Sequence, residues 1–284
     1  MPYCVGSLAL KILDKLDDGQ IGTIIQTFRN TVYVRSIDDH LICITSHDVK
    51  GLVNMNVDSN VEFGTVSMHQ LVYKSNNTLR IGDLILPFRN ISNYERERQS
   101  NISEGVEKRV FEAANLLRIL VVEGSLLDSN SPFFQASAGR IKKILWMAKK
   151  GDFIGLQNSI VGLVGLGAGF TPSGDDFVAG FLYSLSRMGM MQSISGITNL
   201  ISHRTSWHSR KFIEYAQEGF VIQQLEDFVD TLLYGTGEMI TDSFLELIRI
   251  GHSSGIDSAL GVLIATSIKM NDAYCYSVLE KLGL

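Results

Sequence analysis

The sequence contains few cysteines and no excess of basic residues. Its three cysteines, Cys4, Cys43 and Cys275, are odd in number, lie far apart and form no CxxC pair. This spacing argues against a zinc site and a disulfide framework, and it fits a reducing cytoplasm. The formal net charge of -5 and the pI near 5.7 argue against a nucleic-acid-binding surface, because such surfaces carry clustered Lys and Arg. We therefore expect small molecules, and no nucleic acid, as ligands.

The sequence also lacks hydrophobic segments of the kind that direct a chain into or across a membrane. Residues 1–19 do not combine a basic start with a long apolar stretch, and no later apolar run is long enough to span a bilayer. We expect no membrane insertion, no export and a cytoplasmic location. With 284 residues, of which 45% are hydrophobic and 19% charged, the chain can bury the core of one large domain or two smaller ones.

The pattern of apolar residues changes near residue 90. Before this point, short β-rich runs alternate with breaks that contain Gly, Asn, Asp or Ser, which predicts an antiparallel sheet or a small barrel. The polar stretch 89–105 is the best candidate for a linker. The predicted strand regions are 21–28, 31–37, 41–46, 61–74 and 79–88.

After the linker, apolar residues recur at helical intervals, with glycine near the end of most segments. The predicted helices cover 106–124, 138–151, 176–189, 209–220, 223–235, 241–251 and 258–270. The sequence therefore predicts an α+β protein. A β-rich antiparallel N-terminal domain would cover residues 1–90, and a mainly α-helical C-terminal domain would cover residues 104–284.

The run GLGAGFTPSGDDF, residues 165–177, combines three alternating glycines with two adjacent acids. Pro172 suits the first turn of a helix, where its missing N–H is not needed, and Thr171 is then the predicted N-cap residue. Asp175 and Asp176 would lie in that first turn, where unpaired N–H groups and the positive end of the helix dipole attract anions. The glycine spacing is not that of a dinucleotide-binding fold, and no GK[ST] follows, so neither a dinucleotide site nor a P-loop is predicted.

A second segment, IGHSSGIDSALGVL, repeats the pattern Ser-Gly-x-Asp-x-x-x-Gly-x-Leu at identical spacing. Both copies would begin apolar helices, and the later glycine would permit close helix packing. One interpretation is a paired ligand site; the others are that the acids only favour the helix dipole, or that the repeat is structural. We prefer the paired site. The corresponding residues are Ser173, Gly174, Asp176, Gly180 and Leu182 in the first copy and Ser254, Gly255, Asp257, Gly261 and Leu263 in the second.

Two further polar features lie near these helices in the sequence. His252 precedes the second copy and offers a proton carrier, although an isolated histidine is more often structural. The cluster HRTSWHSRKF contains Arg204 and Thr205, whose guanidinium and hydroxyl groups suit a carboxylate or phosphate. The alternative for this cluster is a solvated loop between helices that Trp207 anchors.

These motifs together resemble a bacterial family marked by a GxGxGxTPSGDD signature and a later GHSSGxD element. The resemblance covers about residues 155 to 265. The family includes a subunit of oxamate carbamoyltransferase encoded with allantoin-degradation genes. The resemblance thus implies purine catabolism, a β-rich N-terminal region, companion transferase subunits, and transfer of a carbamoyl group between carbamoyl phosphate and oxamate.

The candidate site follows from the motifs and the resemblance. Its ligands would be small anions such as carbamoyl phosphate or oxamate, and an aspartate that faces phosphate would need a proton or a metal. The candidate catalytic residues are Asp175, Asp176, His252 and Asp257. The candidate substrate-binding residues are Gly167, Gly169, Thr171, Ser173, Gly174, Arg204, Thr205, Ser253, Ser254 and Gly255.

Two other classes of protein stay open. In a Mg²⁺-assisted phosphate or acyl enzyme, Asp175, Asp176 and Asp257 would supply oxygen ligands to the metal. No metal ligand is otherwise predicted, and Mg²⁺ is the one cofactor considered. In a noncatalytic subunit, the same loops would bind a metabolite or complete the site of a partner.

Overall fold

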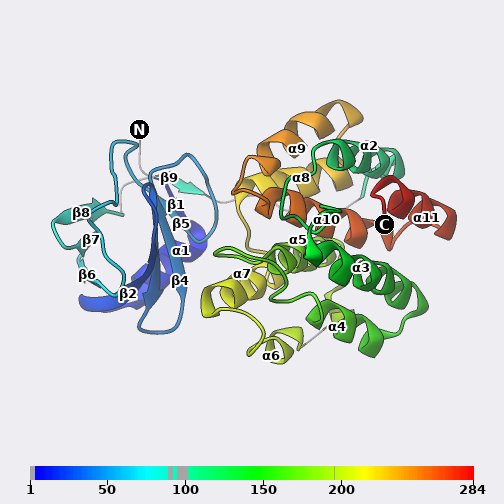
Figure 1. Cartoon of the computed structure of the whole chain (residues 1–284). Coiled ribbons are helices and arrows are strands. Elements are labelled where there is room, and N and C mark those ends of the chain that lie inside the picture. Colours follow the sequence, from blue (N-terminus) through cyan, green and yellow to red (C-terminus); the bar gives the residue numbers. More distant parts are fainter. Residues whose placement is uncertain (1–3, 89–91, 95–101, 195) are drawn as a thin grey trace. The chain divides into compact units, whose positions relative to one another are not determined.

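The computed structural model describes residues 4–88, 92–94, 102–194 and 196–284 (Figure 1). By its internal contacts the chain divides into two units. The first comprises Met1–Arg98 with Phe220–Gln223, and the second comprises Gln99–Gly219 with Gln224–Leu284. More than half of the predicted linker, at 89–91 and 95–101, lies outside the described residues.

The first unit is built on one curled, mainly antiparallel sheet, as the sequence predicts. The strand order is β8-β7-β6-β2-β3-β4-β5-β1-β9, and only the β4–β5 and β1–β9 pairs are parallel in the part that the structure describes. The strands are β1 (Cys4–Gly6), β2 (Gly19–Thr27), β3 (Thr31–Ser36), β4 (Leu41–Thr45), β5 (Asn54–Asn56), β6 (Leu71–Ser75), β7 (Thr78–Ile81), β8 (Leu84–Pro87) and β9 (Ser92–Tyr94).

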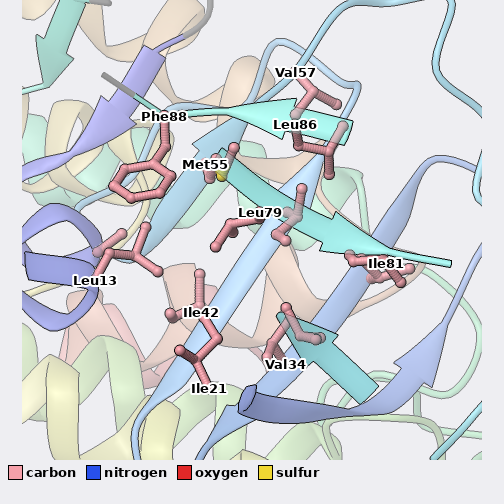
Figure 2. Close-up of a cluster of buried hydrophobic side chains, with 14 of the residues drawn as sticks. Leu13, Ile21, Val34, Ile42, Met55, Val57, Leu79, Ile81, Leu86 and Phe88 are labelled. Carbon is pink, nitrogen blue, oxygen red and sulfur yellow. The ribbon is translucent and has the colours of Figure 1, made fainter. Parts of the chain in front are cut away.

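The core of this unit lies between the sheet and helix α1 (Ser7–Lys15), which the sequence analysis did not predict. Leu13 of α1 is buried together with Ile21, Val34 and Ile42 of the sheet (Figure 2). The predicted strand over 61–74 is wrong in its first part. The chain there forms turns, in which Phe63 N donates to Arg29 O at 2.8 Å, and the strand starts only at Leu71.

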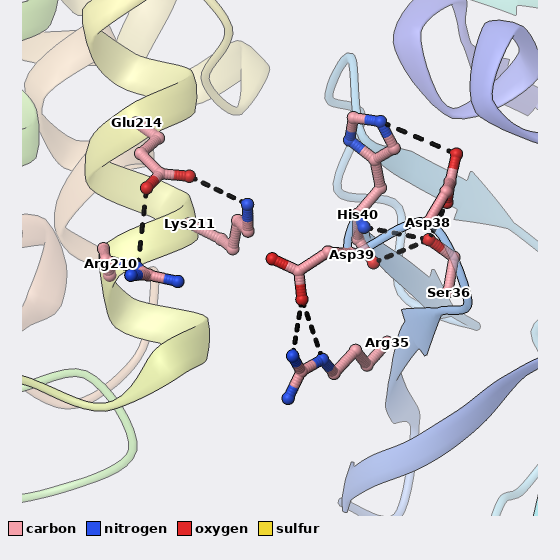
Figure 3. Close-up of polar contacts among 8 residues, drawn as sticks. All are labelled: Arg35, Ser36, Asp38, Asp39, His40, Arg210, Lys211 and Glu214. Atoms are coloured by element: carbon pink, nitrogen blue, oxygen red, sulfur yellow. Dashed lines mark hydrogen bonds and ion pairs between the residues drawn. The ribbon is translucent and has the colours of Figure 1, made fainter. Parts of the chain in front are cut away.

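The turn between β3 and β4 is held by its own polar side chains (Figure 3). The guanidinium of Arg35 donates to Asp39 Oδ1 from Nε at 3.0 Å and from Nη2 at 2.6 Å. Asp39 adopts a positive φ of 67°, a conformation that Asp tolerates in turns. The break that the sequence places at residues 38–39 is therefore a turn.

The second unit is helical, as predicted. Helix α3 begins at Pro132, earlier than the sequence pattern indicated, because Ser131 caps it by accepting a hydrogen bond from Phe133 N. No helix in the described ranges is long and apolar enough to cross a membrane. The helices are α2 (Val106–Ile119), α3 (Pro132–Lys150), α4 (Phe153–Val161), α5 (Ser173–Arg187), α6 (Ile197–Leu200), α7 (Trp207–Gln217), α8 (Gln223–Tyr234), α9 (Ile240–Ile248), α10 (Ser254–Ser267) and α11 (Asp272–Lys281).

Helix α10 is the central helix of this unit (Figure 1). All its residues from Gly255 to Ser267 are buried, and it contacts α2, α3, α5, α9 and α11. A helix that is apolar on every side requires such a surrounding layer. Its main partner is α5, so the two Ser-Gly-x-Asp helices lie together in the core.

Candidate functional site

The two repeated helices pack backbone against backbone through a reciprocal pair of glycines. A Cβ atom built at Gly180 would lie 2.2 Å from the carbonyl oxygen of Ser258 in α10. One built at Gly261 would lie 2.1 Å from the carbonyl oxygen of Phe177 in α5. No side chain fits at these distances, so the predicted role of these glycines in close helix packing is confirmed.

The first turns of the two helices also have similar surroundings, because each packs against the turn of the chain that precedes it. A Cβ atom at Gly174 would lie 1.9 Å from Leu163 O, and one at Gly255 would lie 2.1 Å from Leu247 O. The N–H groups of both glycines donate to the preceding turns, to Leu166 O at 2.7 Å and to Ile250 O at 3.1 Å. These two N–H groups are therefore used within the chain, unlike the free donors that the sequence analysis expected.

The predicted N-cap role of Thr171 is wrong. Helix α5 begins at Ser173, and Pro172, with an extended ψ of 144°, occupies the N-cap position without a side-chain cap. Thr171 lies one residue too early for capping. Its hydroxyl instead donates to Asp176 Oδ2 at 3.2 Å and lies 3.4 Å from Ser254 Oγ.

The structure brings the starts of the two helices together through hydroxyl groups. Ser173 Oγ lies 3.3 Å from Ser253 Oγ, while Thr171 makes the second link, to Ser254. Ser173 Oγ also donates to Gly124 O at 3.1 Å. The two elements that repeat in the sequence thus meet in space, on the same side of the helix pair.

The carboxyl groups of the repeats cross over, because each one faces hydroxyls of the other helix. Asp176 lies beside Ser254, and Asp257 lies beside Ser173 and Ser253. Burial raises the pKa of Asp176 well above its ordinary value; the Ser254 and Thr171 hydroxyls oppose the rise, whereas the charges of Asp257 and Asp175 add to it. The Asp176 carboxyl therefore retains its proton to a higher pH than an exposed aspartate does.

Asp257 is the most buried of these acids, with no exposed surface. Its Oδ1 accepts a hydrogen bond from Leu126 N at 2.8 Å, and its Oδ2 makes no hydrogen bond of standard geometry within the described residues. Burial raises the pKa of Asp257 to about 7, and the hydrogen bond from Leu126 N and the nearby Ser173 and Ser253 hydroxyls oppose the rise. Burial removes the carboxyl from water and disfavours its charged form, which explains the direction of the shift.

Asp175 occupies a different environment from its neighbour Asp176. Its Oδ1 accepts from Gly165 N at 2.7 Å, and its Oδ2 accepts from Ser209 Oγ at 2.6 Å and from the Thr205 hydroxyl. Burial raises the pKa of Asp175, and these three donors oppose the rise. Asp175 therefore joins the glycine-rich loop to the start of α7.

Other residues of the cluster at 203–212 hold the start of α7 and contact the glycine-rich loop. Ser206 caps α7 by accepting from Ser209 N at 3.2 Å, and the ring of His208 stacks on Phe170 at 3.8 Å between centroids. On the same helix, Glu214 pairs with Lys211 at 3.0 Å and with Arg210 at 3.5 Å (Figure 3).

The remaining candidate residues lie at the edge of the paired helix starts. Arg204 has an exposed side chain, and its carbonyl oxygen lies 2.1 Å from where a Cβ atom of Gly165 would be. His252 is exposed in the turn before α10. Gly167, with φ of 120°, packs on the backbone N of Ser173, and Gly169 is exposed with φ of 104°.

The three aspartates do not make the oxygen ligand set that a magnesium site requires. The Asp175 carboxylate accepts hydrogen bonds from three donors of the chain. Oδ1 of Asp257 accepts one from Leu126 N. Nowhere in the described ranges do three or more His, Cys, Asp or Glu side chains form a group that could hold a metal ion. We therefore derive no step through a metal.

The predicted helix over 106–124 is wrong at its end, because α2 stops at Ile119, and the sequence analysis missed the role of the segment between α2 and α3. Gly124 and Leu126 of this segment bond to Ser173 and Asp257, across more than a hundred residues of chain in the case of Asp257. A polar cavity of about 670 Å³ lies beside them, with Arg118 and Asn130 among its lining residues. The one local signal is the sequence DSNSP, which is typical of a turn before a capped helix.

Comparison with known proteins finds a family that part of the chain resembles. Residues 163–266, which include all of α5 and all but the last residue of α10, match the family model of a carbamoyltransferase subunit. That family is described as oxamate carbamoyltransferase subunit AllH, and the match supports membership of the chain in it, as the motifs indicated. No curated protein and no solved structure matches the chain.

Proposed function

We propose that this chain binds the small anionic substrates of an oxamate carbamoyltransferase at the paired starts of α5 and α10. The reaction is transfer of a carbamoyl group between carbamoyl phosphate and oxamate. The observation that carries the proposal is the crossed arrangement of the two Ser-Gly-x-Asp elements, which lie within the segment that matches the family.

The meeting of two helix starts favours an anion for electrostatic reasons. Helices α5 and α10 have 15 and 14 residues, and each contributes the positive end of its dipole. Thr171 and Ser254 are partly exposed, and their hydroxyls can turn away from Asp176 to donate hydrogen bonds to phosphate or carboxylate oxygens. An ionised Asp176 would repel such an anion, so we place its carboxylate beside the amide N–H of oxamate and not beside the phosphate.

The two halves of this site differ in accessibility, and we assign them different roles. Thr171, Asp176 and Ser254 are partly exposed, whereas Ser173 and Asp257 are buried. The exposed half therefore contacts the ligand, and the buried half holds the two helix starts together. The glycine-rich loop completes the exposed half.

Asp176 is our candidate for proton transfer in the reaction. As the amide nitrogen of oxamate bonds to the carbamoyl carbon, the bond from that carbon to the phosphate oxygen breaks and the nitrogen releases a proton. The ionised Asp176 carboxylate can accept this proton, and its raised pKa makes it a stronger base than the carboxylate of an exposed aspartate. His252, exposed in the turn before α10, is the second candidate for this role.

We also propose that the chain acts with companion subunits, since the matching family is described as a subunit. The test is reconstitution with the proteins encoded beside it, followed by assay of carbamoyl transfer. We expect activity from the complex and none from the purified chain alone.

Asp176→Asn provides the sharper test of the site. It should lower kcat of the complex by roughly a hundredfold, because a general base is lost while the shape is kept. Asp242→Asn is the matched control, since Asp242 is an exposed acid in the first turn of α9. Full activity of the Asp176→Asn complex would show that the paired helix starts are not the reaction site.

A further inference from the structure

The cavity between α2 and α3 has the volume of a small-molecule site. It measures about 670 Å³, within the usual range for such sites. Its polar wall is formed by Arg118, Glu123, Gly124, Asp128, Asn130 and Ser131. None of these residues belongs to the motifs that the sequence analysis singled out.

Asp128 organises the wall of the cavity by binding its backbone. Its Oδ2 accepts from Gly124 N at 3.0 Å and its Oδ1 accepts from Asn130 N at 3.0 Å. Ser131 is likewise engaged, because it caps α3 through Phe133 N. The carboxylate of Asp128 is thus committed to the fold, and the turn around it has a fixed shape.

The same turn is bonded to both of the repeated helix starts. Gly124 O accepts the hydroxyl of Ser173 at 3.1 Å, and Leu126 N donates to Asp257 at 2.8 Å. Gly124 therefore lines the cavity with one part of its backbone and contacts the start of α5 with another. A ligand in the cavity would lie beside the turn that bonds to the buried half of the helix starts, Ser173 and Asp257.

Of the charged residues that line the cavity, Arg118 and Glu123 form no hydrogen bond or ion pair with the residues that the structure describes. Arg118, at the end of α2, is exposed, and Gly283 packs against its guanidinium, since a Cβ atom built at Gly283 would lie 3.1 Å from Cζ. Glu123 is also exposed. A guanidinium binds a carboxylate through two parallel hydrogen bonds, and a carboxylate accepts from an amide N–H.

We propose that this cavity is a subsite for a small ligand that carries both a carboxylate and an amide N–H group, with Arg118 binding the carboxylate and Glu123 the amide. The inference rests on the proposed function, under which the ligand is oxamate or its carbamoylated product. It assigns the acceptor to a place of its own, beside the helix starts that receive the phosphate-bearing donor.

The test measures the KM for oxamate in the reconstituted complex that contains the full chain. Arg118→Lys keeps the positive charge but loses the two-pronged geometry, so it should raise the KM for oxamate roughly tenfold or more and leave the KM for carbamoyl phosphate unchanged. Arg140→Lys, on the exposed surface of α3 and outside the cavity lining, is the matched control and should change neither value.

Glu123→Gln tests recognition of the amide by comparing oxamate with oxalate, which has no N–H group, as a competitor. The variant should bind oxamate more weakly while its affinity for oxalate is unchanged or higher. If the wild-type complex is inactive, the proposed function fails and this inference fails with it. If the complex is active but Arg118→Lys and Glu123→Gln leave the KM for oxamate unchanged, this inference alone is wrong.

Discussion

Replacement of Asp257 by Asn should change how the stability of the helical unit depends on pH. In the folded state the pKa of Asp257 is raised by burial to about 7, from an ordinary value near 3.8. Because the folded state then binds the proton more tightly than the unfolded state, this group favours folding fully below about pH 4. That contribution is lost as the pH rises to about 7, where the folded protein must hold a buried carboxylate.

The size of the effect follows from the difference between the two pKa values. About 3 pKa units correspond to on the order of 4 kcal/mol between the two ends of this pH range. Asn cannot ionise, and its amide oxygen can still accept the hydrogen bond from Leu126 N. The free energy of unfolding of Asp257→Asn, relative to that of the wild type, should therefore increase by up to this amount from pH 4 to pH 7.

Urea unfolding followed by tryptophan fluorescence measures this difference in the intact chain. Trp146 and Trp207, the two tryptophans of the sequence, both lie in the helical unit, so their emission reports on that unit. Asp242→Asn, which removes an exposed acid, should follow the wild-type profile. Parallel pH profiles for the wild type and Asp257→Asn would refute the reasoning, because they would mean that Asp257 ionises in the folded state as easily as in the unfolded state.

Two further substitutions test the packing around the site. Gly261→Ala should lower the free energy of unfolding by about 3 kcal/mol, because its Cβ would lie 2.1 Å from Phe177 O. Gly139→Ala is the control: a Cβ atom there meets open space in α3, so this change should be neutral or stabilising by up to about 1 kcal/mol. Equal effects of the two substitutions would contradict the backbone contact at Gly261. Asp175→Asn should lower the free energy of unfolding by about 2 kcal/mol, because hydrogen bonds to a charged carboxylate are lost. Thr205→Ser keeps the hydroxyl and should stay near the wild type; both variants are measured by urea unfolding. An unchanged free energy for Asp175→Asn would argue against the role of Asp175 in joining the glycine-rich loop to α7.

The sequence predicted the architecture because periodicity is a local property. Alternating and helical patterns on the two sides of residue 90 indicated the sheet and the helices, and the later glycine of each repeat indicated close packing. The predicted strand at 61–74 began too early, since apolar residues such as Phe63 and Val66 can be buried in turns as well as in a strand.

The details of the site were less predictable because they depend on contacts between distant residues. Asp175 and Asp176 are neighbours in sequence, yet a helix turns by about 100° per residue, so only Asp176 faces Ser254 while Asp175 faces α7. The hydrogen bond between Leu126 and Asp257 joins residues 131 positions apart, and no local sequence pattern indicates it.

The crossed pairing of the repeats makes each motif an unreliable diagnostic by itself. The first element provides a carboxyl whose hydroxyl neighbour belongs to the second element, and the reverse holds for Asp257 and Ser173. A related chain that kept TPSGDD but lost the second serine of GHSSGxD would retain a well-formed α5, in which Asp176 kept Thr171 but lost its hydroxyl partner from the other helix. Searches for functional relatives should therefore require both elements together, and proteins with only one should be classed apart from this chain.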